Sequence, residues 1–216
     1  MSNPSIDLNI EGNVAVLTMN NPPANTWTQD TLTALKDTVT ELNANKNVYA
    51  LVITGQGEKF FSAGADLNVF ASGDKGVAAT MSKVFGDAFE ALTNFRGVSI
   101  AAINGYAMGG GLEVALACDI RIAEEQAQMA LPEAKVGLLP CAGGTQNLAW
   151  LVGEGWAKRM ILCGERLKAD KAREIGLVEE VVGAGESLAA AMKLANQVGE
   201  QSPVAVTACK ELIQNG

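Results

Sequence analysis

The chain has 216 residues, a hydrophobic content of 48% and a formal net charge of -8, which is enough apolar material for one sizeable core. It contains no histidine, which excludes Ser-His-Asp and Cys-His catalysis in their usual forms and also excludes histidine-based metal sites. No run of Lys or Arg offers a basic tail, so we expect neither nucleic acid nor a membrane surface as a partner.

Strand and helix patterns follow one another from the start of the chain. Residues 6–10 and 14–19 alternate in polarity around residues 11–13, which predicts a β-hairpin. Apolar residues at helical spacing predict a helix over residues 28–43, and residues 50–54 predict a buried strand. Residues 55–67 are rich in glycine and predict a long loop.

The pattern continues through the rest of the chain. A second amphipathic helix is indicated by apolar residues at helical spacing, namely Met81, Phe85, Phe89, Leu92 and Phe95. Residues 98–103 and 119–123 predict further strands, and helical patterns dominate from residue 144 onwards, interrupted at residues 178–182. This alternation predicts the α/β fold class. A helical pattern is still in progress at Gly216, so we expect a truncated C-terminus.

Three consecutive glycines, Gly109, Gly110 and Gly111, lie between a predicted strand and a predicted apolar helix. They match neither the dinucleotide-binding nor the P-loop spacing. They could form an oxyanion hole, in which a backbone N–H group stabilises a developing negative charge, or they could simply allow close packing of helix on strand. The small residues Ala63 and Ala65 of the loop FFSAGADL could supply a second donor, although an ordinary turn is the simpler interpretation.

Two glutamates stand in apolar surroundings. Glu113 lies near the start of the helix that follows the glycines, and Glu133 lies in the segment MALPEAKVGLLP. Glu113 could be a helix-capping group, and Glu133 could belong to a surface turn with Lys135 as an ion partner. The functional interpretation is that the pair holds one water, with one carboxylate taking a proton while the other gives one.

These stretches jointly resemble the crotonase superfamily, in its enoyl-CoA hydratase/isomerase branch. The resemblance rests on NPPAN, FFSAGADL, INGYAMGGGLEVALACDIRIA, LPEAKVGLLPCAGGTQ, ERLKADKAREIGLVEEVV and SPVAV, which follow the family's order along nearly the whole chain. It implies a crotonase-like spiral of ββα units over residues 1–200, with residues 201–216 beginning a helical C-terminal region. It also implies a homotrimer or a dimer of trimers, an acyl-CoA thioester substrate, and no metal or redox cofactor.

The resemblance also assigns roles to residues by position. The oxyanion-hole N–H groups would belong to Ala65 and Gly110. Glu113 matches the glutamate that activates water at Cβ, and Glu133 matches the one that exchanges a proton at Cα. The residues expected to lie along coenzyme A are Ala24, Lys59, Ala63, Asp66 and Leu67.

Glutamate at both positions favours an enoyl-CoA hydratase, a lyase that adds water reversibly across the 2,3 double bond. A Δ3,Δ2-enoyl-CoA isomerase, another acyl-CoA enzyme of the family and a non-catalytic acyl-CoA-binding protein are the alternatives. RNA binding, seen in a relative, is disfavoured because the chain lacks a basic helix. Cys141 departs from the family, since glycine is common there, and we expect it to alter substrate shape rather than act as a nucleophile.

The expected location is the cytoplasm. The four cysteines are scattered without a CxxC pair, which is typical of reduced thiols, and the first residues show no signal-peptide pattern. No apolar run is long enough to cross a bilayer.

Overall fold

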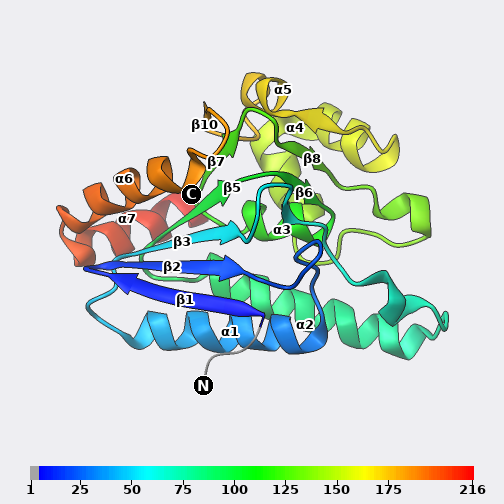
Figure 1. The fold of residues 1–216 in the computed structure, drawn as a ribbon, viewed down its shortest axis with the longest axis horizontal. Helices are drawn as coiled ribbons and strands as arrows, with labels where there is room; N and C mark the ends of the chain where they lie inside the picture. Colours follow the sequence, from blue (N-terminus) through cyan, green and yellow to red (C-terminus); the bar gives the residue numbers. More distant parts are fainter. Residues whose placement is uncertain (1–4) are drawn as a thin grey trace.

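A six-stranded sheet forms the centre of the computed structural model, which describes residues 5–216 (Figure 1). Its strands, in spatial order, are β1 (Ile6–Glu11), β2 (Val14–Met19), β3 (Ala50–Gly55), β5 (Val98–Ile103), β7 (Ile120–Glu124) and β10 (Glu180–Val182). β1 and β2 pair antiparallel, which confirms the predicted hairpin, and every other neighbouring pair is parallel. The parallel pairs need crossover connections, which the helices supply.

A second, four-stranded sheet contains β4 (Phe60–Ser62), β6 (Tyr106–Met108), β8 (Gln128–Ala130) and β9 (Leu167–Lys168). The chain passes three times from the large sheet to the small sheet and then into a helix. The helices that close these passes are α2 (Lys75–Thr93) after β3 and β4, α3 (Gly110–Leu116) after β5 and β6, and α4 (Gly144–Leu162) after β7 and β8. This repeat is the predicted spiral of ββα units, and the α/β fold class is confirmed.

The central strands of the large sheet are buried on both faces, and successive side chains of each strand point to opposite sides. In β3, Leu51 and Ile53 belong to the core shared with α1 (Gln29–Ala44) and α2. Ala50 and Val52 point to the other face, where α6 (Ser187–Gly199) packs. Figure 1 shows α1 and α2 on one side of the sheet and α6 on the other. Central strands therefore need continuous apolar sequence, as residues 50–54 have.

The first two long helices begin at side-chain caps. Thr28 caps α1 through a capping box with Thr31, so this helix begins where the sequence predicted. Asp74 accepts hydrogen bonds from the first amides of α2. That helix ends at Thr93, so the prediction that Phe95 lies within it is wrong: Phe95 follows the C-cap residue and is buried in the core from the loop.

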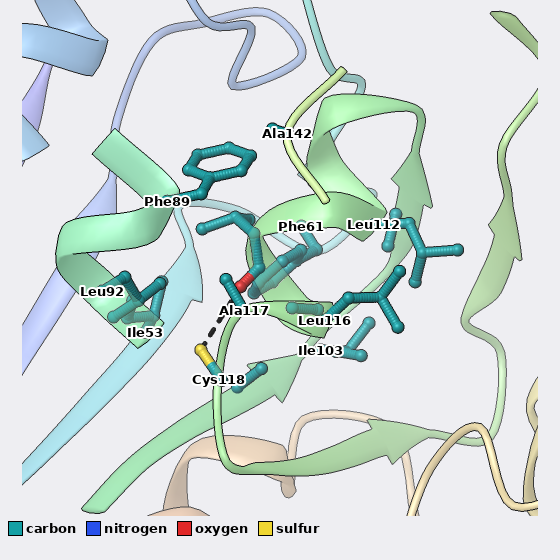
Figure 2. Close-up of a cluster of buried hydrophobic side chains, with 14 of the residues drawn as sticks. Ile53, Phe61, Phe89, Leu92, Ile103, Leu112, Leu116, Ala117, Cys118 and Ala142 are labelled. Atoms are coloured by element: carbon teal, nitrogen blue, oxygen red, sulfur yellow. Dashed lines mark hydrogen bonds between the residues drawn. The ribbon is translucent and has the colours of Figure 1, made fainter. Parts of the chain in front are cut away.

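All seven residues of α3, from Gly110 to Leu116, are buried. Figure 2 shows its side chains packed among those of α2 and the large sheet, with Leu112, Leu116, Phe89, Leu92, Ile53 and Ile103 labelled. Full burial of one such apolar side chain contributes about 1.5–3 kcal/mol. A charged residue within this helix must therefore find a polar partner inside the protein.

The prediction of a loop over residues 55–67 is wrong for β4, which lies within that range. The sequence patterns also did not predict β6 and β8. Each of these strands has only three residues, too few for an alternating pattern to be recognisable. The short helical elements are η1 (Leu67–Phe70), η2 (Glu133–Val136) and α5 (Ala169–Glu174).

The last helix, α7 (Pro203–Asn215), has no buried residue and is attached by polar contacts. Lys210 donates hydrogen bonds to the carbonyl oxygens of Phe95 and Gly97 and to the carboxylate of Asp119, the last at 2.8 Å. The role of residues 201–216 as the start of a further helical region stays a prediction. Within residues 5–216, no helix is both long and apolar enough to span a bilayer.

Candidate active site

A cavity of about 710 Å³ opens beside the N-terminus of α3. Five segments line it: the segment before α1, at Thr26, the residues after β4 including η1, the N-terminal half of α2, the start of α3, and the segment that includes η2 and the residues on either side of it. This cavity brings together most of the predicted site residues, namely Ala63, Ala65, Asp66, Leu67, Gly110, Glu113 and Glu133. They come from positions up to 70 residues apart in the chain, so the fold assembles the site.

Two predicted coenzyme A contacts, Ala24 and Lys59, are not among the cavity-lining residues. The carbonyl oxygen of Ala24 accepts a hydrogen bond of 2.9 Å from the amide of Ala63, so Ala24 helps to hold a cavity-lining residue in place. The Lys59 ammonium lies 5.4 Å from the centre of the Phe60 ring. Their contacts with coenzyme A stay predictions.

The glycines serve packing as well as the cavity. A Cβ atom at Gly111 would lie 2.1 Å from the carbonyl oxygen of Ser62, and one at Gly64 would lie 2.6 Å from that of Met108. Gly64 and Gly109 also have φ angles of +88° and +53°, which side chains disfavour. The packing interpretation therefore holds for Gly111 and Gly64. Both allow the loop after β4 to lie directly against the start of α3.

Two backbone donors beside this junction, the N–H groups of Ala65 and Gly110, have no protein acceptor among residues 5–216. Gly110 is the first residue of α3, where helical N–H groups have no partner within the helix. Both residues line the cavity, so both amides are available to an oxygen atom of a ligand.

Glu113 is buried, with only 2% of its surface exposed. Its Oε1 accepts hydrogen bonds from the amides of Ala142 and Gly144, at 2.9 and 3.0 Å. The carboxylate therefore does not cap its own helix; it reaches the start of α4. Burial raises the pKa of Glu113, and the backbone hydrogen bonds oppose that rise because they stabilise the anion.

Glu133 has the opposite environment. Both of its carboxylate oxygens are buried, and within the described chain neither has a hydrogen-bond partner. Burial, with a smaller contribution from the charge of Glu113, raises the pKa of Glu133 to about 7. The expected alternative, an ion pair with Lys135, is not formed among residues 5–216. The anion of Glu113 is therefore stabilised by two backbone amides, whereas that of Glu133 has no such partner.

Cys141 also lines the cavity and is half-buried as a free thiol. Burial raises the pKa of its thiol, and the charges of Glu113 and Glu133 raise it further. The thiol is therefore uncharged at neutral pH. This agrees with the expectation that Cys141 shapes the cavity and is not a nucleophile.

Sequence reasoning missed the contribution of α2. Ala78, Ser82 and Phe85 lie along one face of this helix and line the cavity. Their spacing of four and three residues was a usable signal, but it overlaps the apolar pattern that marks the core face. Among residues 5–216, no group of three or more Cys, Asp or Glu side chains is placed to hold a metal ion.

The chain is similar to known proteins along nearly its whole length. The family model described as enoyl-CoA hydratase/isomerase matches residues 9–216. The short-chain-enoyl-CoA hydratase of Clostridium acetobutylicum is 40% identical over an alignment that covers 98% of this chain and 82% of that protein. The 2,3-dehydroadipyl-CoA hydratase of Escherichia coli is also 40% identical, with coverage of 93% and 78%.

Solved structures match equally well. The structure of DspI from Pseudomonas aeruginosa is 65% identical, with a TM-score of 0.96 and coverage of 98% of this chain and 86% of that one. An enoyl-CoA hydratase from Bacillus anthracis is 37% identical, with a TM-score of 0.94 and coverage of 98% and 83%. These matches confirm the resemblance drawn from the sequence motifs.

Proposed function

The chain belongs to the enoyl-CoA hydratase/isomerase family, and on that premise we propose that its cavity catalyses the reversible syn addition of water across the 2,3 double bond of a 2-enoyl-CoA thioester. One observation carries the proposal. Two carboxylates in opposite hydrogen-bonding environments share a cavity with two unoccupied backbone amides. These are the groups that adding water to a conjugated thioester requires.

The amides of Ala65 and Gly110 would bind the thioester carbonyl oxygen. When water attacks Cβ, the π electrons move toward this oxygen, and an enolate-like charge develops on it. Backbone donors that are already oriented stabilise this charge without reorganisation. Because the donor at Gly110 begins a helix, the partial positive charge of the helix terminus adds to the effect.

The two glutamates would handle the protons. Glu113, whose carboxylate accepts hydrogen bonds from the amides of Ala142 and Gly144, would remove a proton from the water that forms the new bond to Cβ. Glu133, protonated near neutral pH, gives its proton to Cα. One proton is thus shared by the pair before and after the reaction, and only its position changes. Addition of water involves no change in redox state, so the proposed reaction requires no redox cofactor, and the backbone amides and carboxylates take the roles of polarising the carbonyl and activating water that a metal could otherwise fill.

The test is to mix the purified protein with crotonyl-CoA and to follow the loss of the conjugated enoyl-thioester absorbance. We expect rapid loss that Glu113→Gln and Glu133→Gln each reduce by about 100-fold or more, with binding of CoA retained. Near-normal hydration by either variant would remove that residue from the mechanism. Turnover of a 3-enoyl-CoA without hydration of crotonyl-CoA would instead identify an isomerase, and binding without any turnover would identify an acyl-CoA-binding protein.

We further propose assembly as a homotrimer or a dimer of trimers, and a cytoplasmic location. The family resemblance supports the assembly, and large apolar side chains exposed on α4 and α7 are consistent with it, namely Trp150, Leu162, Val204, Leu212 and Ile213. Four free cysteines and a coenzyme A substrate support the location. Light scattering on the purified protein measures the assembly; a monomer at micromolar concentration would contradict it.

A further inference from the structure

Two buried polar residues outside the cavity hold the segment that carries the Ala65 amide. We propose that Asn25 and Ser62 are positioning residues that set the spacing between the Ala65 and Gly110 amides, an inference that rests on the proposed function. Neither residue lines the cavity. Both are buried, with 4% of Asn25 and none of Ser62 exposed.

Asn25 holds the strand that leads to the site. Its side-chain amide donates hydrogen bonds to three carbonyl oxygens around β4, those of Gln56, Phe60 and Phe61, at 3.1, 3.0 and 3.3 Å. Its φ angle of +51° lies in the left-handed region, which asparagine tolerates better than most residues. In this backbone conformation the side chain of Asn25 reaches β4, and its carbonyl oxygen reaches the hydroxyl group of Ser62.

Ser62 connects Asn25 to both sides of the junction. Its hydroxyl donates a hydrogen bond of 2.7 Å to the carbonyl oxygen of Asn25 and accepts one of 3.2 Å from the Gly64 amide. Its own carbonyl oxygen lies only 2.1 Å from the position that a Cβ atom at Gly111 would occupy, so a side chain there would clash with it. One residue therefore contacts the neighbour of Ala65 on one side and the neighbour of Gly110 on the other.

The backbone on either side of the Ala65 amide is also held. Trp27 donates from its amide to the Gly64 carbonyl oxygen at 2.8 Å, and the Asp66 amide donates to the Trp27 carbonyl oxygen at 3.0 Å. The peptide that carries the Ala65 N–H group is therefore fixed between bonded neighbours while its own donor stays unoccupied. Since a hydrogen bond weakens steeply with angle, small shifts of this segment would weaken its bond to the thioester oxygen.

The chain offers a matched control in Asn104, which clamps the other end of the same loop. Its side-chain amide donates to the carbonyl oxygens of Gly55 and Gly57 at 2.9 and 2.7 Å, and it is 7% exposed. All four side-chain hydrogen bonds of Asn104 are made with residues 54–57, and none of them reaches residues 62–66. Asn104→Ala thus removes a comparable number of buried hydrogen bonds without loosening the Ala65 segment.

The experiment compares Ser62→Ala, Asn25→Gly and Asn104→Ala in the full chain. Glycine at 25 accepts the positive φ, so that variant isolates the loss of the side chain. The readout is the carbonyl stretching frequency of butyryl-CoA labelled with ¹³C at the thioester carbon, measured by infrared difference spectroscopy. This saturated thioester cannot be hydrated, so its carbonyl reports the two donors alone.

We expect binding to the unsubstituted protein to lower this frequency. Ser62→Ala and Asn25→Gly should return it toward the free value and lower kcat for crotonyl-CoA by about 10–100-fold, with KM changed less than about threefold. Asn104→Ala should lose thermal stability but keep the bound frequency. Ser62→Cys, which keeps a weaker donor, should fall between Ser62→Ala and the unsubstituted protein, and it replaces Ser62→Ala if that variant does not fold.

The outcomes separate the two proposals. A frequency that does not change when the unsubstituted protein binds would overturn the oxyanion hole itself. A lowered frequency that is the same in Ser62→Ala, Ser62→Cys and Asn25→Gly would overturn the positioning role and leave the oxyanion hole standing. An equal shift in Asn104→Ala would assign the effect to general loosening of the loop and would also overturn the positioning role.

Discussion

The Gly144 amide donates a hydrogen bond of 3.0 Å to Oε1 of Glu113, and a Cβ atom at residue 144 would lie 2.7 Å from that same oxygen. The carboxylate therefore occupies the space in which a side chain would begin. The reason for a glycine at position 144 is therefore the neighbouring carboxylate. The backbone conformation of residue 144 does not itself favour glycine, because its φ angle lies outside the left-handed region. The start of α4 is thus built around the position of Glu113.

Gly144→Ala should displace the Glu113 carboxylate and lower kcat for crotonyl-CoA by about 100-fold. Gly155→Ala is the control, because residue 155 lies in α4 beyond the kink at Gly153 and its Cβ would have no atom within 4 Å. Steady-state kinetics and circular dichroism on both variants check the prediction. Normal kcat in a folded Gly144→Ala variant would show that Glu113 does not need its present position.

The donor at Gly110 can be removed with little change to the helix. Gly110→Pro deletes the N–H group at the first position of α3, where proline is well tolerated. We expect it to lower kcat by about 100–1,000-fold. Gly110→Ala keeps the N–H group and meets the same neighbour, the Phe85 ring at 2.8 Å, so it separates steric effects from loss of the donor. Equal activity in the two variants would contradict the role of this amide.

The pH dependence of the reaction should follow the single shared proton. Because burial raises the pKa of Glu133 to about 7, kcat/KM for hydration should fall about tenfold per pH unit above that value, as Glu133 loses its proton. Hydration neither releases nor takes up a proton overall, so its equilibrium constant is independent of pH. The profile for dehydration of 3-hydroxybutyryl-CoA must then have the same shape. A flat profile from pH 6 to 9 would contradict the assignment of the proton to Glu133.

Glu133 should also reduce the stability of the fold above neutral pH. Its pKa is about 7 in the folded protein and near 4.5 as an isolated group, so the folded state binds the proton more tightly than the unfolded state does. The free energy of unfolding therefore falls as the pH rises from about 4.5 to about 7. Glu133→Gln removes the penalty. We expect its Tm to exceed that of the unsubstituted protein by roughly 3–6 °C at pH 8, with a smaller gain at pH 5. Calorimetry at both pH values tests this; a difference that does not depend on pH would refute it.

Cys141 should be dispensable for the chemistry. Burial and the two glutamates raise the pKa of its thiol, so the reactive thiolate is scarce. We expect Cys141→Ala to keep kcat for crotonyl-CoA within about threefold. Iodoacetamide at pH 8 should modify the exposed Cys163 and Cys209 before Cys141, as peptide mass spectrometry would show. Preferential labelling of Cys141, or loss of turnover in Cys141→Ala, would require a chemical role for the thiol.

The sequence by itself determined the features that depend on neighbours in the chain. The hairpin over residues 6–19, the long helices and the longer buried strands follow from polarity patterns of period two and 3.6. The position of Glu113 in the first turn of α3 follows from its distance from the glycines. Several specific motifs in one order also identified the family, and FFSAGADL, INGYAMGGGLEVALACDIRIA and LPEAKVGLLPCAGGTQ among them carry residues that line the cavity.

Only the tertiary structure decided the features that depend on distant segments. The three-residue strands exist because they pair with one another across the spiral, and α2 lines the cavity because it packs beside η1 and α3. Glu113 and Glu133 have similar sequence surroundings, yet one meets two amides and the other meets none. The pKa of a carboxyl group is set by its burial and its partners in space, and the local sequence specifies neither.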